Sequence, residues 1–372
     1  MPARRIPGPM SDTLSISSIR MAALVTSANV GIGVLTLPRF AAVGAESGAP
    51  LLTAAGILCG TMSLLLLAYL CSRHPGENLI FFSEKLVGAP VARVMNGLLI
   101  LYFLLVSGIS LRQFGEVVVL VLLQKTPMQI VECMLLLVVA LSARRDLIKF
   151  SFVHSFYLPF ILLPGLFIVL IATRSIDPNN LLPLIGNHRG DWPNESVKIA
   201  SLSQMSFVFC LLVPLMKFPK RAASSVAIGA AVGGSLYLLV VLTTVGMFGA
   251  EETKILTYPT LETARSASMG VGQRLDALFL IIWVISIYTT IYATYYFSVH
   301  ASRDLFRLED HRMLASFYMP AVYAVSMIPP NIHVLYSLWD LSGRYGFLLT
   351  AAYPLLLLVM SFIRSGRRRA HA

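Results

Sequence analysis

The residues with the clearest capacity for ligand chemistry lie in a glycine-containing segment, residues 29–38. Gly31 and Gly33 stand two positions apart inside an apolar run that ends at Pro38. Glycine is a poor helix former and proline lacks an N–H donor, so the pattern predicts a helix that opens near its middle. The N–H groups of the two glycines would then suit a ligand carboxylate, with Asn29 and Thr36 beside them. Close helix packing through small residues is the alternative.

A second polar group falls within the apolar run at residues 199–216. Ser201, Ser203, Gln204 and Ser206 crowd into one short stretch of it. Ser203 and Ser206 are three positions apart and share a helix face, whereas Gln204 points about 100° away from Ser203. These side chains either line a ligand site or form hydrogen bonds between neighbouring helices.

Hydroxyl groups and a histidine occur in three further apolar runs. Tyr102 and Thr290 would place hydroxyls at mid-membrane depth, and Thr290 belongs to a stretch rich in tyrosine and threonine, residues 288–296. His154 is isolated among apolar neighbours, where a hydrogen-bonded core histidine is a more common role than a proton relay. We therefore treat Tyr102 and Thr290 as candidate ligand contacts and His154 as a core residue.

Charged side chains inside apolar spans are functional candidates, because their burial is unfavourable. Arg112 and Glu116 stand four residues apart, as do Asp340 and Arg344, so each pair can form an ion pair along one helix face. A structural salt bridge and a role in coupling ligand binding to conformational change are both open for these pairs. Glu132 has no local partner, and we expect its carboxylate to reach water at the membrane surface.

The composition requires a membrane environment for these residues. Of 372 residues, 56% are hydrophobic and 13% are charged, whereas soluble domains carry about 25% charged residues. A soluble globule could not bury so much apolar surface, so the net charge of +11 indicates membrane topology and not nucleic-acid binding. A crossing needs about 20 residues. On that basis ten transmembrane helices are predicted within residues 21–38, 47–72, 94–123, 126–143, 150–173, 199–216, 222–250, 277–302, 313–339 and 345–363.

The distribution of Lys and Arg predicts the orientation of these helices. With the N-terminus inside, most basic residues fall in segments on the cytoplasmic side. We therefore expect both termini in the cytoplasm, and two long outer loops at residues 174–198 and 251–274. The predicted domains are a cytoplasmic tail at residues 1–15, a ten-helix transmembrane domain at residues 16–363 and a basic cytoplasmic tail at residues 364–372.

The sequence motifs do not favour an enzyme, a metal site or a cofactor. The sequence contains no Ser/His/Asp or Cys/His arrangement, no zinc-protease motif and no phosphate-binding loop. Its four cysteines lie singly in apolar runs, without a Cys-x-x-Cys pair. We therefore expect a protein that is not an enzyme and that uses no metal or cofactor.

Several stretches, taken in order over residues 13–365, resemble the spore germination permease family. Members of that family are the B-type subunits of germinant receptors in spore-forming bacteria. The stretches that carry the resemblance are Gly31-Ile-Gly-Val-Leu-Thr-Leu-Pro38, Arg112-Gln-Phe-Gly-Glu116, Thr126-Pro-Met-Gln129, Asp177-Pro-Asn-Asn-Leu-Leu-Pro183, Tyr258-Pro-Thr260 and Arg274-Leu-Asp-Ala-Leu-Phe-Leu-Ile-Ile-Trp283.

The resemblance implies an all-α integral membrane fold of the APC superfamily, similar to LeuT. In that fold ten helices form two inverted repeats of five, and helices 1 and 6 are broken around a central site. It also implies a small-molecule germinant, commonly an amino acid, recognised in the lipid of the spore inner membrane. An A-type receptor subunit and a C-type lipoprotein are the implied protein partners. The family often carries a Gly-x-Glu-like element in helix 6, where this chain has Ser206-Phe-Val208 without the carboxylate.

Three functions are compatible with these features. A receptor subunit would bind an amino-acid-like germinant at the opened helix and signal to its partners. An amino-acid or polyamine transporter, either a symporter or an exchanger, would use the same site. The lack of an unpaired mid-membrane carboxylate favours the receptor over a proton symporter, whereas carbonyls and hydroxyls could still serve sodium. A structural subunit with an empty site is the third.

Overall fold

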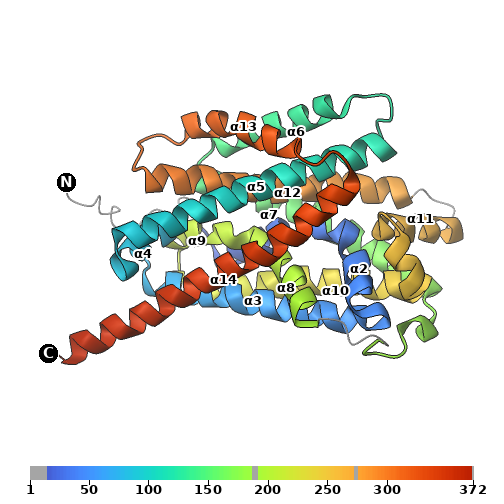
Figure 1. Ribbon diagram of the computed structural model, residues 1–372, viewed down its shortest axis with the longest axis horizontal. Coiled ribbons are helices and arrows are strands. Elements are labelled where there is room, and N and C mark those ends of the chain that lie inside the picture. Colours follow the sequence, from blue (N-terminus) through green and yellow to red (C-terminus); the bar gives the residue numbers. More distant parts are fainter. Residues whose placement is uncertain (1–14, 187–191, 272–274, 371–372) are drawn as a thin grey trace.

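The computed structural model describes residues 15–186, 192–271 and 275–370, and these residues form a bundle of helices (Figure 1). Almost all of the predicted N-terminal tail, residues 1–15, lies outside the described residues. At the other end, helix α14 (Ile332–Ala370) continues into the predicted C-terminal tail.

The first half of the chain begins with an interrupted helix. Ser17 caps the first part, where its side chain accepts a hydrogen bond from the Arg20 N–H at 3.3 Å. Gly88 adopts a φ of 89°, which favours glycine, at the junction between a short helix and a long one. In order, the helices are α1 (Ser18–Asn29), α2 (Ile32–Ala45), α3 (Ala49–Arg73), α4 (Leu79–Val87), α5 (Ala89–Val121), α6 (Met128–Ala143) and α7 (Leu147–Ala172).

The second half begins with the other irregular span. There α8 (Trp192–Ser203) passes into a 3₁₀ segment (Gln204–Val208) and then into the single turn α9 (Phe209–Leu212). The remaining helices are α10 (Ala222–Ile255), α11 (Pro259–Val271), α12 (Leu275–Leu305), α13 (Arg312–Ser326) and α14.

The expectation of a long outer loop at residues 251–274 is wrong. Helix α10 continues to Ile255 through a kink at Gly249, where φ is 72°, and α11 occupies most of the remainder. The polar composition suggested a loop, but Leu261 and Ala264 on α11 are buried. Thr263 of α11 also hydrogen-bonds Thr244 of α10 at 3.0 Å. One face of a polar segment is therefore packed, as in an amphipathic helix.

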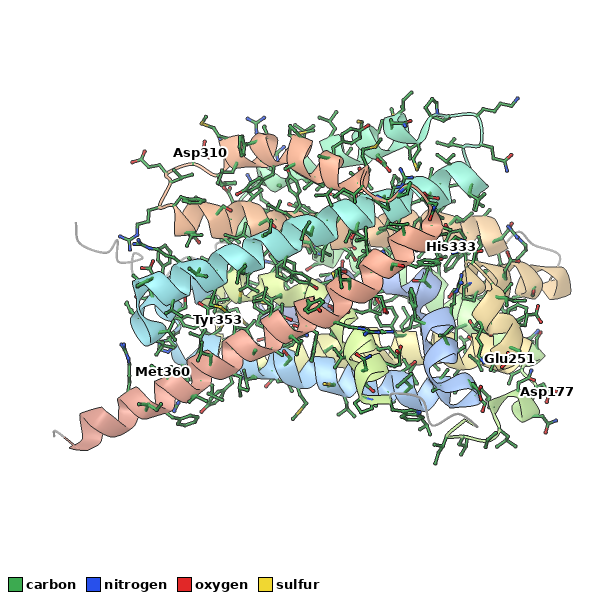
Figure 2. The ribbon with its side chains drawn as sticks, viewed as in Figure 1. Asp177, Glu251, Asp310, His333, Tyr353 and Met360 are labelled. Atoms are coloured by element: carbon green, nitrogen blue, oxygen red, sulfur yellow. The ribbon has the colours of Figure 1, made fainter. Side chains whose placement is uncertain are left out.

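The apolar helices account for the membrane character. By length and composition, seven helical stretches among the described residues can cross a membrane, and α6 is apolar but shorter. A multi-pass membrane protein is thereby supported, whereas the count of ten spans stays a prediction. Asp177 and Glu251, from the two segments predicted outside, lie at one end of the bundle, and Asp310 lies at the opposite end (Figure 2). Which end faces the cytoplasm also stays a prediction.

The interrupted first helix occupies the interior of this bundle. Helix α1 packs against α7, α10 and α12, and α2 packs against α3, α8 and α10. Helix α14 crosses the bundle diagonally and contacts α3, α5 and α8 (Figure 1). Helices α6 and α13 lie together along the edge beside α5. The centre is therefore built from α1, α2, α8 and α12, with the other helices around them.

Candidate functional site

The predicted opening of the first helix is present, and it falls at Val30 and Gly31. Helix α1 ends at Asn29 and α2 begins at Ile32, and the two intervening residues have non-helical backbone angles. An interruption of this kind leaves carbonyl and N–H groups without partners in their own helix. In a membrane such groups need partners from neighbouring elements or a lined cavity.

Hydroxyl side chains from two other helices satisfy the freed carbonyls. Three come from one face of α12 and one comes from α10, and each donates to a different carbonyl of the chain around the opening. The donors and acceptors are Thr289 to Ser27 at 2.9 Å, Thr290 to Ala28 at 2.9 Å, Ser286 to Val30 and Tyr237 to Asn29. Thr290, predicted as a ligand contact, therefore acts with Ser286 and Thr289 to cap the opened helix.

The irregular part of the sixth span is joined to the same place. The backbone N–H of Ser206, within the 3₁₀ segment, donates to the side-chain oxygen of Asn29 at 3.1 Å. Both groups are buried. The two irregular spans are therefore joined directly by this buried hydrogen bond.

Tyr237 also stands where the ligand carboxylate was expected. Its hydroxyl faces the backbone N–H groups of Gly31 and Gly33. A Cβ added at Gly33 would lie 2.8 Å from the Tyr237 oxygen. A carboxylate can therefore reach these N–H groups only after the tyrosine side chain has moved. The sequence offered no signal for this role beyond a single tyrosine in a glycine-rich span.

A small cavity opens beside the start of α2. Gly33 and Thr36 of α2 line it, together with Lys198 and Ser201 of α8 and Asp340 of α14. Its volume is about 40 Å³. One water needs about 10–15 Å³ on this measure, so the space holds only a few waters. An amino acid would require α2, α8 and α14 to separate.

An ion-pair network lies at this cavity. The Lys198 ammonium lies 2.8 Å from a carboxylate oxygen of Asp340 and 2.7 Å from one of Glu195. Asp340 also pairs with Arg344 at 3.1 Å, as its spacing predicted. The side chains of Lys198 and Asp340 are 18% and 35% exposed, so both are only partly buried. The cavity therefore offers one cationic and one anionic group, which are the complements of an amino acid's two charges.

The structure brings together some of the predicted site residues and separates others. Asn29, Gly31, Ser206 and Thr290 meet at the opening, with Gly33 and Thr36 at the cavity next to it. Gln204 and Ser203 instead face α3. The Gln204 amide donates to the Gly60 carbonyl at 3.4 Å, and a Cβ added at Gly60 would lie 2.6 Å from Ser203 Oγ. Tyr102 lines a separate apolar cavity of about 310 Å³ between α5, α13 and α14.

The charged pair on α5 belongs to a larger cluster, and the expectation for Glu132 is wrong. Arg112 lies 3.1 Å from Glu116, as predicted, and its other terminal nitrogen lies 3.8 Å from Glu132. The Glu132 side chain is fully buried and does not reach a membrane surface. The reason is that α6 packs closely on α5 at Gly115, where an added Cβ would lie 2.8 Å from the Glu132 carboxylate.

The histidine on α7 is a core residue, as expected. His154 is fully buried, and its Nδ1 lies 3.0 Å from the Ser27 hydroxyl. Its ring stacks on Tyr292 of α12 at a centroid distance of 5.8 Å. The contact joins α7 to the end of α1 just before the opening.

These features define a class of protein: a multi-pass membrane protein with a transporter-like bundle and an opened first helix at its centre. Comparison with solved structures supports this description of the fold. Mhp1, a nucleobase-cation-symport-1 family transporter, in a closed conformation with bromovinylhydantoin bound, matches with a TM-score of 0.67 and 12% sequence identity. The match covers 97% of this chain and 82% of Mhp1. The inward-facing conformation of Mhp1 matches with a TM-score of 0.64 over 94% of this chain and 77% of that one.

Sequence comparison then identifies the family. The family model described as spore germination protein matches residues 15–334, so the chain belongs to the spore germination permease family. Spore germination protein YndE of Bacillus subtilis is 26% identical over 94% of this chain and 97% of its own length. Spore germination protein GerLB of Bacillus cereus is 24% identical over 94% and 95%. The predicted family is confirmed, and the predicted all-helical membrane fold is supported by its likeness to Mhp1.

Proposed function

We propose that this protein is the membrane subunit of a nutrient germinant receptor and that it binds a small amino-acid-like germinant between α2, α8 and α14. Membership of the germination family supports the role. The observation that carries the ligand class is the pairing of Lys198 with Asp340 at a cavity beside the opened helix. The subunit would lie in the spore inner membrane with both termini in the cytoplasm. It would act there with an A-type subunit and a C-type lipoprotein.

The ligand would exploit groups that are already paired in the unliganded site. Its ammonium would replace Lys198 at Asp340, and its carboxylate would replace the Tyr237 hydroxyl at the N–H groups of Gly31 and Gly33. Asp340 would thereby supply the carboxylate that helix 6 lacks in this chain. Charge-assisted hydrogen bonds of this kind contribute about 1.5–3 kcal/mol each. Because the cavity must widen, binding favours the conformation in which α2 and α8 are apart.

Signalling follows from a difference in affinity between conformations. A ligand shifts an equilibrium only by the difference in its binding free energy for the two states. The Asn29–Ser206 hydrogen bond joins the two irregular spans, so a shift of α2 on ligand binding would be passed to the 3₁₀ segment of the sixth span. A partner subunit that contacts the moving helices would respond to this conformational change.

A transporter of an amino acid or polyamine is the second candidate. The observation that favours it is the group of oxygen atoms at the opening, where Thr289 and Thr290 hydroxyls meet the carbonyls of Ser27 and Ala28. Hydroxyl and carbonyl oxygens are suitable ligands for a hard cation. Ion-driven uptake through this site would depend on sodium, whereas a receptor needs no transport.

The test is a gene deletion with two readouts. Spores that lack the gene are exposed to a panel of amino acids, nucleosides and sugars, and growing cells are assayed for uptake of labelled amino acids with and without sodium. The deletion is complemented with the unaltered gene, with Asp340→Asn, and with Asp310→Asn as a control at the end of the bundle opposite Asp177 and Glu251 (Figure 2).

The receptor proposal predicts loss of germination to a nutrient with normal uptake. The unaltered gene and Asp310→Asn should restore the response, and Asp340→Asn should restore it only at about tenfold or more higher nutrient concentration. Normal germination together with lost uptake would contradict the receptor and establish the transporter.

A further inference from the structure

The charged cluster between α5, α6 and α13 is not explained by ligand binding. It contains one cation, the guanidinium of Arg112, and two carboxylates, Glu116 and Glu132. The guanidinium stays protonated in proteins, so its charge is fixed at +1. If both carboxylates were ionised, the cluster would carry one uncompensated negative charge inside the bundle. Burying such a charge is strongly unfavourable, and the usual outcome is that a group becomes neutral.

The geometry distinguishes the two carboxylates. Glu116 lies 3.1 Å from Arg112 and its side chain is 21% exposed, so it has a close counter-charge and is only partly buried. Glu132 lies 3.8 Å from Arg112 and its side chain is fully buried. One of its oxygens has no hydrogen-bond partner. Ionisation therefore costs more free energy at Glu132 than at Glu116.

The hydrogen bonds around Ser326 point the same way. Its hydroxyl oxygen lies 2.9 Å from a Glu132 carboxyl oxygen and 2.8 Å from the Tyr323 carbonyl oxygen. A hydroxyl has a single hydrogen, and a carbonyl oxygen can only accept. Both contacts are hydrogen bonds at once if the Glu132 carboxyl carries a proton, donates it to Ser326, and Ser326 donates to the carbonyl. An ionised Glu132 would leave the two contacts to share one hydrogen.

We propose that Glu132 is a proton-binding site, which holds a proton while Arg112 pairs with Glu116 and releases it when Arg112 turns to Glu132. The proton leaves the carboxyl as H⁺ to water on the side of the partly exposed Glu116, and the carboxylate that remains is neutralised by the guanidinium. No other bond changes. The inference stands on this cluster alone and is independent of the proposed function.

Three helices, α5, α12 and α13, pack on α6 and bring other ionisable groups near Glu132. Helix α5 presents Arg112 and Glu116, and α13 presents Tyr323, which also interacts with Cys133 of α6. Helix α12 contacts the far end of α6, where the hydroxyls of Tyr288 and Tyr292 hydrogen-bond Ser142. Among these groups Arg112 is the only cation, so the proton on Glu132 responds mainly to the position of Arg112.

The test uses the full-length protein in lipid nanodiscs and protons as the only ligand. Infrared difference spectroscopy between pH 9 and pH 5 detects the C=O stretch of a protonated carboxylic acid, which a carboxylate lacks. The unaltered protein is compared with Glu132→Gln and with Glu116→Gln. Glu77→Gln is the matched control, because Glu77 forms an exposed ion pair with Lys85 elsewhere.

The proposal predicts a protonated-carboxyl band at pH 7 that Glu132→Gln removes and Glu77→Gln retains. In Glu116→Gln, Glu132 is the one carboxylate partner of Arg112 left among the described residues, so the band at pH 7 should be lost. A spectrum without a band that Glu132→Gln removes would overturn the proposal. If Glu132→Gln does not fold, Glu116→Gln decides alone: a lost band supports the proton site, and an unchanged band overturns it.

Discussion

The opening of the first helix depends on the absence of a side chain at Gly31, and Gly31→Ala tests that dependence. An added Cβ would overlap the Thr290 hydroxyl, lie 2.9 Å from the Thr290 Cβ and lie 3.0 Å from the Ser286 carbonyl oxygen. The hydroxyl can rotate away, but the carbonyl belongs to the backbone of α12 and cannot. The substitution therefore forces α1 and α12 apart or displaces Thr290 from its position.

The expected loss of stability has two parts. Overpacking a filled interior costs about 1–3 kcal/mol. Displacing the Thr290 hydroxyl leaves the Ala28 carbonyl without its donor at 2.9 Å, and an unsatisfied buried carbonyl costs about 1–3 kcal/mol more. The sum is about 2–6 kcal/mol, so the ratio of folded to unfolded protein should fall by about 30-fold or more.

The assay is thermal unfolding of the purified protein in nanodiscs, with Gly97→Ala as the matched control. Gly97 lies within α5, and a Cβ added there meets no atom within 4 Å. Alanine is a better helix former than glycine by about 0.8–1 kcal/mol, so this control should unfold at the same or a higher temperature. The same chemical change is therefore expected to act in opposite directions at the two positions.

A double variant shows whether Thr290 is the cause. Thr290→Ala removes the oxygen that the new Cβ meets, so Gly31→Ala should destabilise the Thr290→Ala protein less than it destabilises the unaltered one. Equal effects in both backgrounds would show that the Thr290 contact is not responsible. Unfolding of Gly31→Ala at the temperature of Gly97→Ala would refute the packing of the opening as described.

Three further predictions concern single side chains. Tyr237→Phe leaves the buried Asn29 carbonyl without a donor and should lower stability by about 1–3 kcal/mol in thermal unfolding, whereas unchanged unfolding would contradict the cap. Asp340→Asn should change the free energy of unfolding by no more than about 1 kcal/mol, because its pair with Lys198 is partly exposed. The same substitution should nevertheless weaken the germinant response. Burial lowers the pKa of His311 from its ordinary value of 6.5, so the unfolded chain takes up a proton more readily than the folded protein as the pH falls. Stability should therefore decrease as the pH drops from 7 to 5, and less so in His311→Gln; equal pH dependence in both would contradict this.

The opening of helix 1 could be predicted because its cause is local. Two glycines and a proline weaken a helix wherever it packs, so Gly31 and Gly33 identify the position from sequence alone. The i,i+4 pairs at Arg112 and Asp340 are likewise local, since helix geometry fixes their neighbours. The opening of helix 1 and the two ion pairs could therefore be predicted from spacing along the chain alone.

The partners that complete the site could not be predicted, because they are distant in sequence. Tyr237 is 208 positions from the Asn29 carbonyl that it caps, and Ser326 is 194 positions from Glu132. No local pattern indicates which face of α10 meets α1 or that α5, α6 and α13 pack on one another. Lys198 was predicted to lie in a loop, although it belongs to α8 and lines the cavity.

The most direct test of the central claim is a measurement of which amino acids stabilise the purified protein against thermal unfolding. A ligand present at about 100 times its Kd should stabilise the folded state by about 2.7 kcal/mol. We expect at least one amino acid to stabilise the unaltered protein and Asp310→Asn, and we expect Asp340→Asn to lose most of this effect. Equal stabilisation of all three proteins, or stabilisation by none of the amino acids, would contradict a germinant site between α2, α8 and α14.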